Sequence, residues 1–475
     1  MNKNVWLLPQ NSCSMEQFLT TLSTFQKLNG VSRDKNVQQI LMEQHSKKGL
    51  YNPYIKKDHY DLSSANHKID EPRFYGAIYE TANKKIHVST YGELLMKYQD
   101  DQVKRNKVFI GMLYSIQFDN PYKKMQDFNI YPMRLIFQLL REKKLNYYIT
   151  NLEVSEIVYY VKCIPNQSEY ESLVKKILDF RKNDIEIISH KKDCSQFVKN
   201  YVSCNYLFNM LSEMEVTYQQ KDKMNRFSIH SKLRSRPTPI TPRCLYLKEE
   251  YVQFVDKYSL EVSLFEDIKK PQGLRSDWIR EIYNSVPSLL LCEIDEDDGM
   301  YTKYLQIPKL LVESSTNPLK WSEFEEYITK AFNLFVDVEA EKIGGKGQPD
   351  SLCHFLGDGT LFCADGKSTH KKLSSINDGR LKQHRLLYHA KYTIVVTPGF
   401  VPSAVEDIKD TNTCIITSYC FADLITKYIF KHYKEHKDCS YEIFHELILN
   451  NLGTDLSEKI YSIIDDTLGI SLNEL

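Results

Sequence analysis

Two acids and a lysine near residue 350 form the strongest chemical pattern in the sequence. Asp350 precedes one apolar run, and Asp365 and Lys367 end another, with Gly357-Asp358-Gly359 between the runs. Carboxylates held close together repel each other, and a divalent cation relieves that repulsion. Mg²⁺ suits such a site, because it binds a few carboxylate oxygens, keeps several waters and promotes phosphodiester hydrolysis. Lys367 would orient the attacking water or offset charge on the phosphate.

The glycine-rich turn predicts a β-hairpin that brings these side chains together. If Asp358-Gly359 forms the turn, Asp350 falls opposite Lys367; if Gly357-Asp358 forms it, Asp350 falls opposite Asp365. Both registers place all three residues on one face, since side chains two apart on a strand point to the same side. An isolated Asp-x-Lys is more often part of a solvated hairpin than of a catalytic site, so the neighbouring sequence must decide between the two interpretations.

Those surroundings contain three further features. An amphipathic helix carries Glu325, Gly344-Gly345 forms a turn, and Pro349-Asp350 precedes Asp365-Gly366-Lys367. From Phe324 to Thr369 the chain resembles the cleavage domain of FokI-like and AlwI-like type IIS restriction endonucleases, in the PD-(D/E)xK nuclease superfamily. The resemblance implies that Asp350, Asp365 and the carbonyl of Gly366 bind Mg²⁺ and that Lys367 completes the catalytic site. Glu325 is the expected fourth catalytic residue, with Glu323 and Glu326 as close rivals.

The residues after the motif alternate between helix and strand patterns. Helices are expected at 377–390, 402–408 and 421–430, and strands at 391–396 and 414–417. This alternation predicts a sheet with parallel pairs, in a C-terminal α/β domain at residues 322–475. Gln383 and Arg385 on the first helix either face the metal and DNA or lie on a solvated surface, which is the commoner arrangement. The basic run His370 to Lys372 has the same two interpretations.

The N-terminal part is predicted to be mainly helical, with hairpins following the helices. Helices near 14–28 and 37–46 precede a hairpin formed by 74–79 and 85–89. Helices followed by a hairpin are the order of a winged helix, in which a helix enters the major groove of DNA. We therefore expect one winged-helix-like recognition module at 1–130 and a second at 131–307. This region also resembles the recognition half of the same enzymes, more weakly.

Basic residues cluster within the second predicted module. Seven basic residues and one acid occupy 221–243, a segment rich in Ser, Thr and Pro. A loop of this composition suits phosphate contacts, and a solvated linker is the alternative. The predicted DNA-binding residues are Arg226, Lys232, Arg234, Arg236 and Arg243. Arg134 and Arg141 are possible contacts to the DNA backbone.

Residues 308–321 are predicted to link recognition to cleavage. The run from Glu313 to Pro318 is rich in turn-forming residues, and Ser322 is placed to cap the helix that carries Glu325. A hinge here would let the two activities remain separate.

Composition is that of an ordinary multidomain globular protein. The 475 residues are 42% hydrophobic and 26% charged, and 62 basic residues balance 62 acidic ones. The eleven cysteines show no metal-ligand or disulfide spacing. The chain shows neither a signal peptide nor a membrane-spanning run, so we expect a cytoplasmic protein.

Together these patterns predict a multidomain α+β protein that acts as a Mg²⁺-dependent type IIS restriction endonuclease. Its expected partners are double-stranded DNA and, because one site cuts one strand at a time, a transient homodimer through the cleavage domain or a small nuclease subunit. Alternatives are a nicking enzyme, the large subunit of a heterodimeric enzyme, a nuclease of repair or element excision, and a DNA-binding regulator with an inactive nuclease fold.

Overall fold

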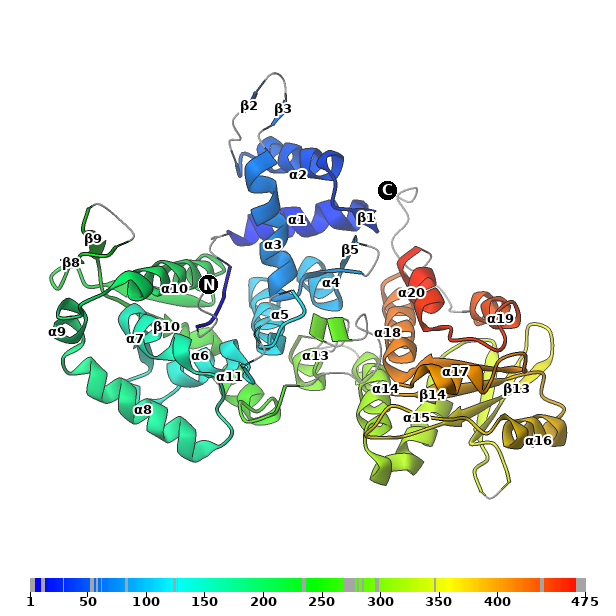
Figure 1. Ribbon diagram of the computed structural model, residues 1–475. Coiled ribbons are helices and arrows are strands. Elements are labelled where there is room, and N and C mark those ends of the chain that lie inside the picture. Colours follow the sequence, from blue (N-terminus) through cyan, green and yellow to red (C-terminus); the bar gives the residue numbers. More distant parts are fainter. Residues whose placement is uncertain are drawn as a thin grey trace. The chain divides into compact units, whose positions relative to one another are not determined.

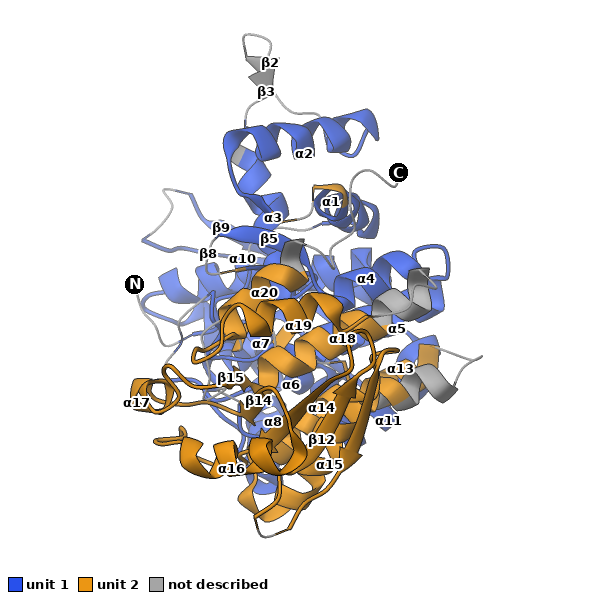
Figure 2. Cartoon of the chain, turned by 90° about the vertical axis from the view of Figure 1, so that its right-hand side faces the viewer, with its two compact units in different colours: residues 1–26, 31–80, 84–269 blue, residues 27–30, 81–83, 270–475 orange. Residues whose placement is uncertain are grey.

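The chain of the computed structural model divides into two compact units (Figure 1, Figure 2). Unit 1 comprises residues 1–26, 31–80 and 84–269, and unit 2 comprises residues 27–30, 81–83 and 270–475. The structure describes residues 5–9, 13–28, 30–51, 55–56, 59–60, 62–81, 84–122, 125, 127–232, 236–268, 278–279, 282–283, 286–294, 299–345, 347–435 and 440–466. Among these residues no helix has the length and apolar character needed to cross a membrane. The mixed α+β, multidomain class predicted from the sequence is confirmed.

Unit 1 is mainly helical. Its helices are α1 (Met15–Lys27), α2 (Lys35–Lys47), η1 (Leu62–Ser64), α3 (Ala65–Tyr75), α4 (Thr90–Lys97), α5 (Gln102–Ser115), α6 (Pro132–Leu140), η2 (Lys143–Leu145), α7 (Asn151–Glu156), η3 (Val158–Tyr160), α8 (Gln167–Arg181), α9 (Asp184–Ser189), α10 (Ser195–Glu213) and α11 (Glu249–Glu261). Its strands are β1 (Val31–Ser32), β2 (Ile55–Lys56), β3 (His59–Tyr60), β4 (Ile78–Glu80), β5 (Lys85–Val88), β6 (Tyr148–Thr150), β7 (Thr217–Lys221), β8 (Phe227–Ile229), β9 (Thr238–Ile240) and β10 (Arg243–Leu247).

Two stretches of unit 1 repeat one order of elements. Apart from β2, β3 and η1, the first runs α1, β1, α2, α3, β4, β5, with the strands in the order β1-β5-β4. Apart from η2, η3, α8, α9, β8 and β9, the second runs α6, β6, α7, α10, β7, β10, with the strands in the order β6-β10-β7. In each, the last strand pairs with both others, and every pair is antiparallel. The two-residue strand β1 is too short to be predicted from the sequence.

The first predicted hairpin begins later than expected. Phe74 and Tyr75 belong to the end of α3 rather than to a strand, and β4 starts at Ile78. The boundary is Gly76, whose φ of 91° is in the left-handed region that glycine adopts without strain. The apolar alternation across this boundary is therefore shared by two elements.

The basic segment 221–243 is not a loop, contrary to the prediction. It contains the end of β7, the hairpin of β8 and β9, and the start of β10. Phe227 pairs with Ile240 in that hairpin, and Ile229 and Ile240 are buried. These apolar residues fold the segment because burying them offsets the conformational entropy lost on ordering it.

Unit 2 is built around one mixed sheet. Its helices are α13 (Ser288–Ile294), α14 (Gly299–Ser315), η4 (Pro318–Lys320), α15 (Trp321–Phe332), α16 (Asp378–Tyr388), α17 (Pro402–Glu406), α18 (Ser418–Glu435), α19 (Glu442–Leu449) and α20 (Ser457–Asp466). Its strands, in sheet order, are β11 (Val338–Lys342), β12 (Ser351–Phe355), β13 (Thr360–Gly366), β14 (Thr393–Thr397) and β15 (Thr413–Thr417). The first three are antiparallel and the last three parallel, which confirms the predicted alternation.

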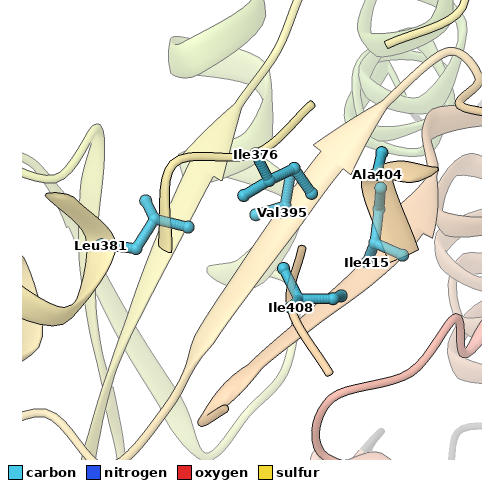
Figure 3. Packing of buried hydrophobic residues seen from close by; sticks show 6 residues of the cluster. All are labelled: Ile376, Leu381, Val395, Ala404, Ile408 and Ile415. Atoms are coloured by element: carbon cyan, nitrogen blue, oxygen red, sulfur yellow. The ribbon is translucent and has the colours of Figure 1, made fainter. Parts of the chain in front are cut away.

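Helices cover both faces of this sheet. On one face, Phe362 of β13 packs against Phe332 of α15, which also contacts Phe421 of α18. On the other face, Val395 and Ile415 of neighbouring strands meet an aliphatic cluster from α16, α17 and their flanking loops: Ile376, Leu381, Ala404 and Ile408 (Figure 3). Val395 is also the register partner of Asp365, so Asp365 lies on this second face.

The segment 308–321 does not form the predicted linker. Residues 308–315 continue α14, with Pro308 inside the helix, and Ser314 and Ser315 are buried. Helix α15 then starts at Trp321, and Ser322 does not cap it. The reason is packing: α14 lies against α15 and α18 within unit 2 (Figure 1). The chain turns only after α14 ends, at Asn317, whose side chain accepts a hydrogen bond from Leu319 N at 3.0 Å.

Candidate active site

The hairpin of β12 and β13 adopts the second of the two predicted registers. Ser351 pairs with Ala364, so Asp350 precedes β12 directly opposite Asp365. The turn itself has four residues, from Leu356 to Gly359, and closes through a 3.0 Å hydrogen bond from Gly359 N to Phe355 O. The two acids therefore lie at the end of the hairpin away from its turn.

Asp350 is anchored to the adjacent strand. Its Oδ2 accepts a 2.7 Å hydrogen bond from the backbone N–H of Gly366. Its carbonyl accepts from Ile343 N at 3.0 Å, which closes the Gly344-Gly345 turn behind it. Gly345 has a φ of 103°, a conformation that requires glycine. One oxygen of Asp350 is thus fixed, and this geometry orients the other.

Asp365 is a fully buried acid with open lone pairs. Its side chain is 0% exposed, and it forms ion pairs with Lys367 at Oδ1 and with Arg380 Nη2 at Oδ2, the latter over 3.6 Å. Neither oxygen accepts a hydrogen bond of acceptable geometry within the described residues. Buried carboxylates normally have their lone pairs satisfied. An acid held in this way is well suited to coordinate a cation.

Lys367 is held beside both acids. Its backbone N–H donates to Val396 O at 2.8 Å, and its carbonyl accepts from Thr397 Oγ1 at 3.1 Å, so β14 fixes the residue. Burial lowers the pKa of Lys367, the charges of Asp350 and Glu325 oppose that shift, and Arg380 adds to it. The ammonium group is therefore close to both acids and to a second cation.

Gly366 allows helix α15 to approach the hairpin. A Cβ at this position would lie 2.8 Å from Ile328 Cδ1 and 3.1 Å from Phe324 Cδ1. Real Cβ atoms do not come so close to carbon, so with a larger residue these side chains or the helix would have to move. The glycine between the acid and the lysine thus permits the close approach of the helix that carries Glu325.

Glu325 is the helix acid that faces the site. It is nearly buried, and its Oε2 lies 3.3 Å from Lys342 Nζ. Burial and the charge of Asp350 raise the pKa of Glu325, and Lys342 and Lys367 oppose the rise. Its rivals point away: Glu323 pairs with Lys320 and Glu326 with Lys330, and both acids are about half exposed.

Helix α16 contributes two residues that the sequence analysis did not select. Arg380 reaches Asp365, and His384 is buried one turn later on the same side. Neither ring nitrogen of His384 has a hydrogen-bond partner among the residues that the structure describes. The i, i+4 spacing of Arg380 and His384 was the available signal. The two residues of this helix that the sequence suggested for the metal or DNA face are Gln383 and Arg385, and Gln383 is exposed. Arg385 is internal and donates to Thr393, Thr413 and Asp378.

The donor atoms at this site suit a hard cation with a partly hydrated shell. In the part of the chain that the structure describes, no three His, Cys, Asp or Glu side chains converge into a metal cage. Two carboxylates and a backbone carbonyl would leave most positions around an ion to water. Mg²⁺ favours that arrangement, because it retains several of its waters when a protein binds it.

The predicted DNA-binding residues of unit 1 occupy two kinds of setting. Arg226, Lys232 and Arg236 are exposed, and Lys232 Nζ lies 3.7 Å from Asp193 Oδ2. Arg234 lies outside the described residues. Arg226 directly precedes β8, and Lys232 and Arg236 lie between β8 and β9, where long cationic side chains can reach a phosphate.

Two other arginines have internal roles. Arg243 is half-buried on β10, and its Nη1 donates to Asn209 Oδ1 at 3.0 Å and to Gln219 Oε1 at 3.3 Å. Arg134 is buried and bonds to the carbonyls of Tyr114 and Ser263. Both guanidinium groups therefore support the fold of unit 1, and their DNA contacts stay predictions.

Comparison with known proteins identifies the family. Residues 1–258 match the model for "Type II restriction endonuclease HgaI, N-terminal domain". The type II restriction enzyme HgaI of Avibacterium volantium is 33% identical over 478 residues, which cover 96% of each chain. The chain belongs to the HgaI family of type II restriction endonucleases. The relationship to type II restriction enzymes implied by the sequence is thereby confirmed.

The HgaI match spans both units. The family model ends within α11, close to the end of unit 1 at Lys269, and the full-length relative also covers the sheet that bears Asp350 and Asp365. Two structures of the restriction endonuclease FokI, one of them bound to DNA, align over 95% of this chain and 99% of their own. Their identity is 9% and their TM-score 0.30, which does not establish a shared fold.

Proposed function

We propose that this HgaI family member is a type IIS restriction endonuclease. Unit 1 recognises a short asymmetric sequence in double-stranded DNA, and unit 2 hydrolyses phosphodiester bonds at an offset position with Mg²⁺. The observation that carries the proposal is the buried carboxylate of Asp365, which lies opposite Asp350 and beside Lys367 and accepts no hydrogen bond from any described residue.

Asp350, Asp365 and the carbonyl of Gly366 are the proposed metal ligands. When bound, the ion supplies a more acidic water and stabilises the leaving oxygen. Asp350 presents one oxygen to the ion because Gly366 N–H holds the other. Lys367 orients the attacking water or offsets charge developing on the phosphate, and its lowered pKa allows it to exchange a proton more readily than an ordinary lysine.

Unit 2 is proposed to be a PD-(D/E)xK nuclease domain. Three features support this proposal: the mixed sheet, the Asp350 and Asp365–Lys367 motif at one end of its hairpin, and Glu325 on helix α15, which packs against Gly366. One such site cuts one strand at a time. We therefore propose a transient homodimer through this unit, or a small nuclease subunit, for cutting both strands.

Unit 1 is proposed to contain two winged-helix-like modules. Each repeated stretch has helices followed by a hairpin, with the last strand paired to both others. Such modules place a helix in the major groove and the hairpin against the backbone. Arg226, Lys232, Arg234 and Arg236 remain the proposed phosphate contacts.

The direct test is cleavage of plasmid and linear DNA with and without Mg²⁺. The purified full-length protein should cut only with the ion, and sequencing of the ends should place every cut at one offset from one asymmetric site. Asp350→Ala, Asp365→Ala and Lys367→Ala should each abolish cutting and retain specific binding in a gel-shift assay. Undiminished cutting by Asp365→Ala would refute the assignment, and nicked product alone would indicate a nicking enzyme.

A second test separates the three candidate helix acids. Glu325→Gln should slow single-turnover cleavage about tenfold to hundredfold, because it removes a charge beside Asp350 and Lys367. Glu323→Gln and Glu326→Gln lose only half-exposed ion pairs and should cut at rates within about twofold of the original. Equal losses for all three variants would remove Glu325 from the site.

A further inference from the structure

Six charged side chains form a connected cluster that includes Asp365, and their formal charges cancel. Three are acids and three are bases, linked by ion pairs and by the charges that act on the pKa values of Glu325 and Lys367: Glu325, Asp350, Asp365, Lys342, Lys367 and Arg380. A divalent cation added to a neutral cluster leaves two uncompensated positive charges. The metal-bound site therefore requires that a base turn away, that an anion arrive, or both.

Arg380 is the base that can turn away most easily. Its side chain is 53% exposed, whereas Lys342 and Lys367 are 31% and 30% exposed. Its contact with Asp365 is also long, at 3.6 Å from Nη2 to Oδ2. A half-exposed guanidinium already keeps part of its hydration, so leaving the carboxylate costs it little.

The rest of α16 holds Arg380 close to the acids. Asn377 caps the helix by accepting from Arg380 N at 3.1 Å, and Leu381 packs in the aliphatic cluster on the same face of the sheet (Figure 3). His384 is buried one turn later, and burial and the charge of Arg380 lower its pKa. The helix is thus fixed, and movement at this position is confined to the long side chain.

We propose that Arg380 is a further residue of the cleavage site, one that pairs with Asp365 in the metal-free protein and binds the scissile phosphate when metal occupies the carboxylates. The inference rests on the proposed metal-dependent function. A guanidinium suits this task, because its planar fork donates two parallel hydrogen bonds to the oxygens of a phosphodiester. The phosphate also supplies the negative charge that the metal-bound cluster lacks.

Two opposite effects follow from one substitution. When Arg380 is replaced, its guanidinium no longer competes with a divalent cation for the carboxylate of Asp365. The cation should therefore bind more tightly in the absence of DNA. The phosphate loses a charged donor, so cleavage should become slower. Replacing an arginine that only supports the fold would not combine tighter metal binding with slower cleavage.

The experiment measures both effects on the full-length protein. Calorimetry with Ca²⁺ and without DNA should show Arg380→Ala binding the ion about two- to fivefold more tightly, the range expected for release from an exposed ion pair. Single-turnover cleavage with Mg²⁺ should fall about tenfold to hundredfold, and Arg380→Lys should retain an intermediate rate. Lys382→Ala, an exposed base two residues along α16, should match the original protein in both assays.

The outcomes distinguish this inference from the function on which it rests. If the original protein cuts DNA and Arg380→Ala binds Ca²⁺ no more tightly, or cuts at the original rate, the role of Arg380 is wrong. If the original protein cuts no DNA, or Asp365→Ala still cuts, the proposed function itself fails. A matching melting temperature for Arg380→Ala and the original protein shows that the effects do not come from unfolding.

Discussion

Unit 1 and unit 2 each contain a buried acid held by an arginine, and the two acids differ in what their oxygens contact. In unit 1, Glu153 is 0% exposed, and Arg181 binds both of its oxygens while Thr150 N donates to Oε2 at 2.8 Å. In unit 2, Asp365 is equally buried, but neither oxygen accepts a hydrogen bond within the described residues.

The difference separates an acid that supports the fold from one available for chemistry. Arg181 also donates to the carbonyls of Leu145 and Tyr148, so its pair with Glu153 ties together a turn, a strand and a helix. The ionic partners of Asp365 are partly exposed, and within the described residues they donate no hydrogen bond to it. Open lone pairs on a buried carboxylate, rather than burial alone, mark the site.

The largest effect should come from Asp365→Asn. Cleavage should fall by at least about 10³-fold, because the amide replaces a proposed metal ligand. The melting temperature should change by no more than about 2 °C, since Lys367 and Arg380 are exposed enough to hydrate once the charge is gone. Single-turnover kinetics and calorimetric melting measure both. A large loss of stability would mean that Asp365 supports the fold as Glu153 does.

Glu153→Gln should have the opposite profile. It leaves the mostly buried guanidinium of Arg181 without a counter-charge, which costs about 3–5 kcal/mol of folding free energy. Denaturant unfolding should show this loss, and cleavage per folded molecule should be unchanged. Asp256→Asn is the matched control, because its pair with Arg141 is half exposed and is worth less than about 1 kcal/mol. Equal effects of the two variants would contradict the comparison.

The sequence predicted the geometry of this site better than its charge balance. The Asp350 and Asp365–Lys367 cluster follows from turn residues and strand period, which are local properties. The choice of Glu325 over its two rivals required the structure, because three acids within four residues of a helix differ only in what packs against them. Arg380 and Lys342 come from elements that tertiary packing brings to the hairpin, and no local pattern encodes that approach.

The fold shows the same limit. The alternation of unit 2 was readable from period and turns, whereas α14 was missed because Pro308 and a turn-rich run resemble a linker. The packing of α14 against α18 outweighs those local preferences. The basic hairpin of β8 and β9 was missed because its apolar anchors, Ile229 and Ile240, are single residues among many polar ones.

Glu71 of unit 1 is a buried acid intermediate between Glu153, whose oxygens both accept hydrogen bonds, and Asp365. It is buried, its Oε1 lacks a hydrogen-bond partner within the described residues, and burial raises its pKa to about 8. A folded-state pKa above the unfolded value stabilises the protein fully below about pH 4.5, and the stabilisation is lost as pH rises through 8. Glu71→Gln should therefore be the more stable form at pH 9, by a few kcal/mol.

Chemical denaturation from pH 5 to pH 9 checks this expectation. The difference in unfolding free energy between Glu71→Gln and the original protein should grow with pH, whereas Glu153→Gln should lose stability because Arg181 loses its carboxylate partner. A pH-independent difference for Glu71→Gln would mean that the Glu71 carboxyl does not titrate between pH 5 and pH 9.

The smallest effect should come from Gly366→Ala, which tests how tightly α15 packs on the site. The new Cβ would lie 2.8 Å from Ile328 Cδ1, so the Ile328 side chain or the helix must shift, at a cost of about 1–3 kcal/mol. Because α15 carries Glu325, cleavage should slow together with the loss of stability. Ile328→Val removes the clashing methyl group, costs about 0.5–1.5 kcal/mol alone, and should restore much of both properties in the double variant. If Gly366→Ala were stable but inactive and Ile328→Val gave no rescue, the glycine would act through its backbone at the metal rather than through the position of the helix.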